Sequence, residues 1–165
     1  MTDLAPLLTE AAELIALCTK RGLKIATAES CTGGLIAGVL TEIAGSSAVV
    51  DRGFVTYSNE AKTELLGVPA ELLKPEGPGA VSEETARAMV EGALKRSNAH
   101  LVVAVTGIAG PAGGSLHKPV GLVHFAAVKR GGEIQHVEQR FGDIGRSRIR
   151  LATVREALEM LRSLI

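Results

Sequence analysis

Two spacings of apolar residues alternate along this chain, and they predict the order of its elements. Helical spacing, with apolar residues three and four apart, is found in residues 4–20, 34–44, 59–66, 82–95 and 143–165. Short apolar or alternating runs, typical of strands, occupy residues 23–28, 49–57, 100–106, 120–129 and 133–141. The last two runs are separated by Arg130-Gly131-Gly132, which is typical of a hairpin.

Strands that alternate with helices and end in a hairpin and a helix predict an α/β fold. We expect a three-layer α/β/α sandwich with a mixed, mostly parallel sheet, formed by residues 1–165 as a single domain. Residues 100–106 are almost continuously apolar, which indicates a central strand buried on both faces. Ligands of such sheets bind at the carboxyl ends of strands, so the loops after Ala28, Tyr57 and Thr106 should meet in one cleft.

Composition and charge argue against several classes of partner. The chain has 165 residues, 46% of them hydrophobic, and 18 basic residues balance 18 acidic ones. Without a basic surplus, and with only four aromatic residues, we expect no binding to nucleic acid or to a membrane surface. Cys18 and Cys31 have no CxxC or disulfide spacing, and no signal or membrane-spanning segment is recognisable, so a cytoplasmic protein is expected. No ligand spacing predicts a metal site.

The stretch from Thr27 to Gly34 places a small nucleophile, Ser30, at a turn from a strand to a helix. The first N–H groups of a helix lack partners inside the helix, so they can bind an oxyanion or a phosphate. The residues around Ser30 do not form the GxSxG pattern of a nucleophile elbow. The alternative is that Ser30 or Thr32 only caps the helix.

A serine nucleophile needs a base, and none of the four histidines lies where a base is expected. Lys62 is predicted in the first turn of a helix, where the positive end of the helix dipole lowers the pKa of an amine. The alternative is a solvated lysine paired with Glu60 or Glu64. Tyr57, five residues earlier, could relay or orient a proton, or could pack at a strand end with its hydroxyl in water. The base is therefore Lys62 or Tyr57.

Glycines follow the buried strand at positions 107, 110, 113 and 114 and allow the backbone to approach a ligand closely. Their spacing matches neither a dinucleotide fingerprint nor a Walker loop. Arg146 and Arg150 are four residues apart near the start of the last helix, so they could hold a phosphate together. Surface ion pairs are the ordinary alternative for these two arginines.

Several long strings resemble the CinA C-terminal-domain family, and the similarity covers nearly the whole chain. They are Thr27 to Gly34, Gly53 to Lys62, Gly79 to Ser82, Gly107 to Pro111 and Lys118 to Gly121. The resemblance implies an amidohydrolase without cofactor or metal that converts nicotinamide mononucleotide to nicotinate mononucleotide and ammonia. A non-catalytic nucleotide-binding module of the same family is the alternative function.

The resemblance also implies roles for particular residues. Ser30 matches the nucleophile, Lys62 with Tyr57 would activate it, and backbone amides near Thr32 to Gly34 would stabilise the oxyanion. The expected substrate-binding residues are Cys31, Thr32, Gly33, Gly34, Thr106, Gly107, Ala109, Gly110, Arg146 and Arg150. The expected partner is a small nucleotide, and we expect a homo-oligomer.

This chain departs from the family pattern at two places. Ala112 stands where many relatives have aspartate after Gly-Pro, which could alter loop anchoring or contacts to a ribose. In relatives an arginine usually follows Gly-Asp directly, whereas here Ile144-Gly145 stand between Gly142-Asp143 and Arg146. The match of Arg146 to the family's arginine is therefore defined only to within a residue or two.

Overall fold

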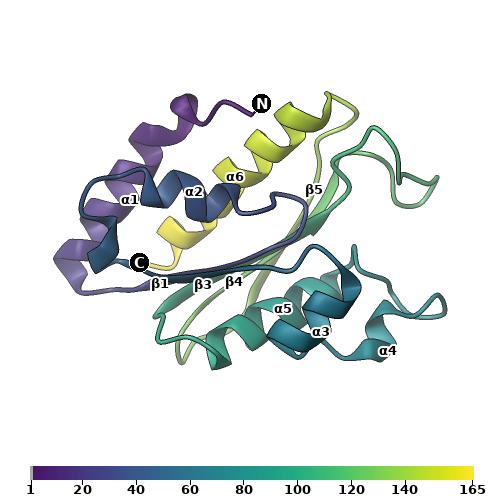
Figure 1. Ribbon diagram of the computed structural model, residues 1–165, viewed down its shortest axis with the longest axis horizontal. Helices are drawn as coiled ribbons and strands as arrows, with labels where there is room; N and C mark the ends of the chain where they lie inside the picture. Colours follow the sequence, from purple (N-terminus) through teal and green to yellow (C-terminus); the bar gives the residue numbers. More distant parts are fainter. Residues whose placement is uncertain (1) are drawn as a thin grey trace.

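A five-stranded sheet lies between two layers of helices in the computed structural model, which describes residues 2–165 (Figure 1). The strands are β1 (Ile25–Glu29), β2 (Val50–Val55), β3 (Leu101–Gly107), β4 (Leu122–Lys129) and β5 (Gln135–Arg140), in the order β2-β1-β3-β4-β5. β1 pairs in parallel with β2 and β3, whereas β3 with β4 and β4 with β5 are antiparallel. Two of the four described strand pairings are parallel and two are antiparallel, which confirms a mixed sheet with a C-terminal hairpin but not a mostly parallel one.

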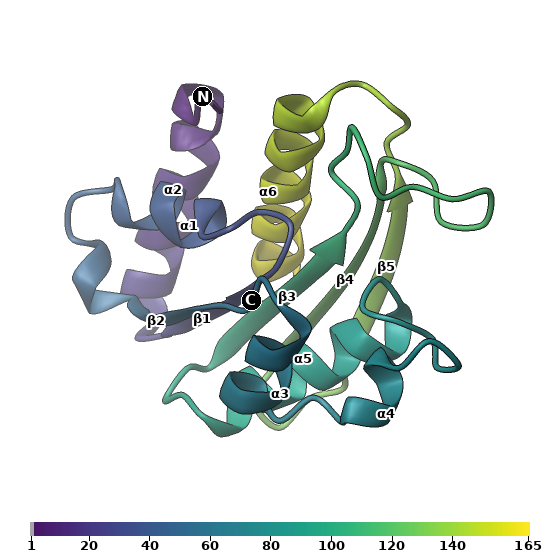
Figure 2. The same cartoon turned by 45° about the vertical axis from the view of Figure 1, so that its right-hand side comes forward.

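Helices cover both faces of the sheet, as the alternation of elements predicted. One layer contains α1 (Leu8–Arg21), α2 (Leu35–Thr41) and α6 (Arg146–Ser163), and the other contains α3 (Asn59–Leu66), α4 (Ala70–Leu73) and α5 (Glu83–Lys95). The views in Figures 1 and 2 agree that these two groups lie on opposite sides of β1 and β3. Two short 3₁₀ turns, η1 (Ala5–Leu7) and η2 (Ser46–Ala48), complete the described elements. The predicted three-layer sandwich is confirmed.

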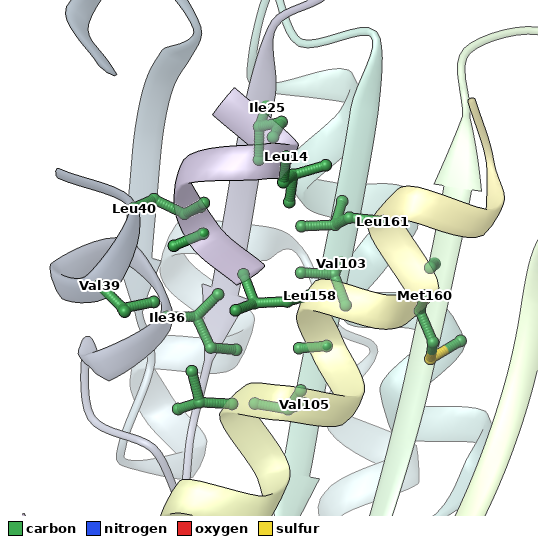
Figure 3. Close-up of a cluster of buried hydrophobic side chains, with 14 of the residues drawn as sticks. Leu14, Ile25, Ile36, Val39, Leu40, Val103, Val105, Leu158, Met160 and Leu161 are labelled. Carbon is green, nitrogen blue, oxygen red and sulfur yellow. The ribbon is translucent and has the colours of Figure 1, made fainter. Parts of the chain in front are cut away.

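β3 is the central strand of the core, and its side chains alternate between the two layers. Val103 and Val105 pack with Leu14 of α1, Ile36 of α2 and Leu158 of α6 (Figure 3). The intervening side chains of β3 belong to a second apolar cluster together with residues of α5. Each fully buried Val or Leu side chain stabilises the fold by roughly 1.5–3 kcal/mol. Burial on both faces explains why residues 100–106 contain almost no polar side chain.

The parallel strands β1, β2 and β3 end at the same edge of the sheet. Glu29, the last residue of β1, is in register with Val55 of β2 and Val105 of β3. β2 ends two residues earlier than the pattern predicted, so Tyr57 lies in the connection to α3 rather than in the strand. The connections that follow the three strands therefore begin side by side.

Candidate active site

A cleft of about 270 Å³ lies at this edge, and all three predicted loops contribute to it. Its lining comes from five segments: Ser30 and Cys31; Tyr57, Asn59 and Lys62; Ala80 and Val81; Thr106 to Gly110 with Ala112 and Gly113; and Arg146. None of the four histidines is among the lining residues. The prediction that the loops after β1, β2 and β3 meet in one cleft is therefore confirmed.

Ser30 and Lys62 are in direct contact in this cleft. The distance from Lys62 Nζ to Ser30 Oγ is 3.0 Å, although 32 positions separate the two residues. Lys62 Nζ also donates to the carbonyl oxygen of Thr56 at 2.9 Å. Ser58 caps α3 by accepting a hydrogen bond from the amide of Ala61, so Lys62 lies at the end of the first helical turn and points into the site.

Lys62 is a buried amine without a counter-charge. Its exposed fraction is 1%, and no carboxylate within residues 2–165 forms an ion pair with it, so the alternative pairing with Glu60 or Glu64 is wrong. Burial penalises the ammonium form and lowers the pKa of Lys62. A neutral amine beside a serine hydroxyl can accept its proton, which is the chemistry of a general base.

The turn after β1 differs from the predicted oxyanion site because Glu29 fills it. The Glu29 carboxylate is fully buried and accepts hydrogen bonds from the hydroxyls of Thr27 and Thr32 and from the amides of Gly34, Ile36 and Ala37. The N-terminus of α2 therefore binds the chain's own anion.

Thr32, Gly33 and Gly34 were predicted to bind the substrate, and the structure gives two of their three amides acceptors within the turn itself. None of the three lines the cleft, and the Gly33 amide donates to the carbonyl of Ser30 at 3.0 Å. The amides of Cys31 and Thr32 remain: within residues 2–165 neither donates to a carbonyl oxygen, and the Cys31 amide follows the candidate nucleophile directly. The signal that sequence reasoning missed is an acidic residue, Glu29, in the turn that leads into a helix N-terminus at Gly34.

Cys31 lines the cleft, but its thiol is a poor nucleophile. Burial raises the pKa of the Cys31 thiol to about 12, so at neutral pH it carries its proton. The side chain packs in the apolar cluster between the sheet and α1, α2 and α6. Its backbone amide is the part of Cys31 that is available for chemistry.

Tyr57 and Arg146 form the outer wall. Tyr57 is 60% exposed, and its hydroxyl accepts a hydrogen bond from Arg146 Nη2 at 3.0 Å, whereas no hydrogen bond joins it to Ser30 or Lys62. The structure therefore does not place Tyr57 as a proton relay. Arg146 also donates from Nη1 to the carbonyl of Gly110 at 2.9 Å, so this guanidinium joins two loops at the cleft. It is the first residue of α6.

Arg150 does not accompany Arg146 in the cleft. Its guanidinium donates to the carbonyls of Cys31, at 3.2 Å, and Thr32, at 2.7 Å, beneath the turn. The structure therefore does not bring Arg150 together with Arg146 for the predicted shared phosphate grip, because Arg150 lies one helical turn further along α6 and contacts the turn after β1.

The loop after β3 forms a further part of the cleft lining. Gly107, Ala109 and Gly110 line the cleft as predicted, and at Gly107 a Cβ would lie 2.7 Å from Val123, so only glycine fits there. The Thr106 hydroxyl donates its single proton to the carbonyl of Ala80 at 2.6 Å. Toward the cleft it can therefore only accept a hydrogen bond.

Six lining residues stand outside the expected catalytic and substrate-binding set: Asn59, Ala80, Val81, Ile108, Ala112 and Gly113. Asn59 and the Gly79 to Ser82 string belong to the stretches that carry the family resemblance, which was the available signal. Within residues 2–165, no three His, Cys, Asp or Glu side chains gather as metal ligands would. No helix of the described part is long and apolar enough to cross a membrane.

Fold and site together define a class: a three-layer α/β/α protein with a buried serine–lysine pair at the carboxyl edge of its parallel strands. The chain belongs to the CinA family, because the model of the CinA C-terminal domain matches residues 8–165. A CinA-like protein of Syntrophus aciditrophicus is 53% identical over 149 residues, which are 89% of this chain and 34% of that protein. The chain thus spans about a third of the length of the curated relatives it matches.

Solved structures agree with this assignment. The competence/damage inducible protein CihA from Agrobacterium tumefaciens has a TM-score of 0.92 and 63% identity, covering 96% of this chain and 94% of that one. A CinA superfamily protein from Escherichia coli has a TM-score of 0.89 and 32% identity, covering 100% and 94%. The names of these relatives give the family and describe the proteins as inducible by competence or damage, but they name no reaction.

Proposed function

We propose that this chain is an amidohydrolase that converts nicotinamide mononucleotide to nicotinate mononucleotide and ammonia. The observation that carries the proposal is the 3.0 Å contact between Ser30 Oγ and the buried amine of Lys62. Burying an amine without a counter-charge is unfavourable, so a pure binding module would have little use for one. The choice of substrate rests on the family resemblance.

Acylation begins with proton transfer from Ser30 to the neutral amine of Lys62. Ser30 Oγ forms a bond to the carboxamide carbon, and the electron pair of the C=O bond moves to oxygen. The Cys31 amide, directly after Ser30, is the proposed donor to this oxyanion. The oxyanion then re-forms the C=O bond as the C–N bond breaks, and the Lys62 ammonium returns its proton to the leaving nitrogen. Ammonia leaves, and the acyl group remains as an ester of Ser30.

Deacylation repeats these steps with water. Lys62 takes a proton from a water molecule while the water oxygen adds to the ester carbon. The Cys31 amide is again the proposed donor to the oxyanion. The bond to Ser30 Oγ breaks, and Lys62 returns the proton to that oxygen. Nicotinate mononucleotide leaves, and the serine and the neutral amine are restored.

Two other features of the cleft support a carboxamide nucleotide. The Thr106 hydroxyl can only accept toward the cleft, so it suits the NH₂ group of a carboxamide. Arg146 is the one cationic residue of the lining besides Lys62, which makes it the candidate for the phosphate. A volume of about 270 Å³ is at the small end for ligand pockets, which favours a mononucleotide over a dinucleotide.

Ammonia release from nicotinamide, its riboside and its mononucleotide tests the proposal. The mononucleotide should be the best substrate, activity should survive EDTA, and Ser30→Ala should lose at least about a thousandfold in rate because the nucleophile is gone. Ser47→Ala, an exposed serine, is the matched control and should keep wild-type activity. Tight nucleotide binding by calorimetry without ammonia release would instead favour the non-catalytic binding module.

A further inference from the structure

The turn that carries Ser30 is held from two sides by opposite charges. From within, the Glu29 carboxylate binds the Thr32 hydroxyl at 2.6 Å and the Gly34 amide at 3.0 Å. From α6, Arg150 Nε donates to the Cys31 carbonyl at 3.2 Å and Arg150 Nη2 to the Thr32 carbonyl at 2.7 Å. Consecutive carbonyls of one tight turn are thus bound by one planar guanidinium.

These contacts fix the amides of the turn, because a trans peptide is planar and its C=O and N–H point in opposite directions. Arg150 on the Thr32 carbonyl orients the Gly33 N–H, and that N–H donates to the Ser30 carbonyl at 3.0 Å. The Ser30 carbonyl belongs to the same peptide plane as the Cys31 N–H. Arg150 is therefore linked through two peptide planes to the amide that directly follows the candidate nucleophile.

We propose that Arg150 is a positioning residue, which fixes Ser30 and the Cys31 amide without touching the substrate. The two arginines of α6 then have separate tasks: Arg146 contacts the contents of the cleft, and Arg150 holds the turn beneath it. The inference deepens the proposed function and rests on it for the role of Ser30. It does not depend on which amide or ester is the substrate.

The experiment measures how fast an alkyl fluorophosphonate labels Ser30, followed by the mass of the intact protein. The hydroxyl attacks phosphorus and displaces fluoride, so the rate reports the geometry of Ser30 without any nucleotide. Arg150→Ala should label about a hundredfold more slowly, as expected when a reacting group is displaced or an oxyanion donor is lost. Millimolar guanidinium, which can occupy the vacated site, should restore labelling in this variant and leave wild type unchanged.

Two further variants complete the comparison. Arg150→Lys keeps the charge but cannot bind both carbonyls in a planar fork, so its rate should fall between wild type and Arg150→Ala. Arg148→Ala removes an exposed arginine of the same helix and should label like wild type. Calorimetry with nicotinamide mononucleotide, with Ser30→Ala in both proteins so that no turnover occurs, should give Kd values with and without Arg150→Ala within about twofold of each other, because a positioning residue does not bind the ligand.

Wild-type labelling in Arg150→Ala would overturn the inference, and so would a large loss of nucleotide affinity with labelling retained, since that would make Arg150 a substrate ligand. A slow rate that guanidinium does not restore, together with a lowered Tm, would show a purely structural role and would also overturn it. Failure of the proposed function has a different signature. The wild-type protein would then label at Ser30 and respond to Arg150→Ala, yet release no ammonia from nicotinamide mononucleotide.

Discussion

Two buried ionisable side chains lie next to Ser30, and they differ in how many hydrogen-bond partners the structure gives them. Glu29, at the end of β1, receives five hydrogen bonds from the turn and from the first residues of α2. Lys62, on α3, has two polar contacts and no carboxylate partner in the described part of the chain. A satisfied buried charge stabilises a fold, whereas an unsatisfied amine is disfavoured as a cation and is poised to act as a base.

The two regions also lie on opposite faces of the sheet. The Glu29 carboxylate contacts the first residues of α2, and Lys62 projects from α3 in the other layer (Figure 2). Ser30 follows β1 between these two layers. The hydrogen bonds of Glu29 therefore hold Ser30 in position, and Lys62 determines how reactive its hydroxyl is. Variants of the two residues should therefore affect different properties.

The largest stability effect is expected for Glu29→Gln. The new NH₂ group faces backbone N–H donors that the carboxylate had satisfied, so the free energy of unfolding should fall by about 3 kcal/mol. Urea denaturation measures this change, with Glu42→Gln, an exposed acid, as the matched control. A loss no larger than that of the control would mean that the Glu29 network contributes little to stability.

Lys62→Met should change the free energy of unfolding by less than Glu29→Gln does, and this change should depend on pH. The pKa of Lys62 is lowered in the folded protein, so the unfolded chain binds more protons between this pKa and the ordinary lysine value of about 10.4. The wild type should therefore gain stability relative to the variant as pH rises through this window. The difference should change by about 1.4 kcal/mol for each unit by which the pKa is lowered.

Urea denaturation of both proteins at neutral pH and near pH 10 measures this difference. Lys20→Met, which replaces an exposed lysine, should show no such change with pH. A difference between Lys62→Met and wild type that stays constant over this range would contradict the lowered pKa.

Much of this architecture could be predicted from the sequence. The two-sided burial of β3 follows from its apolar run, and the meeting of Ser30 with Lys62 follows from loops placed at one edge of a parallel sheet. Both depend on periodicity and topology, which a sequence carries directly.

The errors concern where individual polar side chains point. Glu29 was predicted to lie in the turn after the strand of residues 23–28, without a role, whereas its carboxylate accepts hydrogen bonds from the first amides of α2. Tyr57 was placed on a strand that ends earlier, which left its hydroxyl beside Arg146. Helical spacing put Arg146 and Arg150 on one face, but only the tertiary path of α6 determines that one reaches the cleft and the other reaches the turn.

The pH dependence of fluorophosphonate labelling at Ser30 tests the central claim, that Lys62 is the base, most directly. For the wild type, the labelling rate should rise with pH to a plateau, because only the neutral amine accepts the proton. The midpoint of this rise should lie below the ordinary pKa of lysine. Lys62→Met should label at least about a hundredfold more slowly and lose this transition. Labelling of Lys62→Met at the wild-type rate, with the same pH profile, would contradict the account.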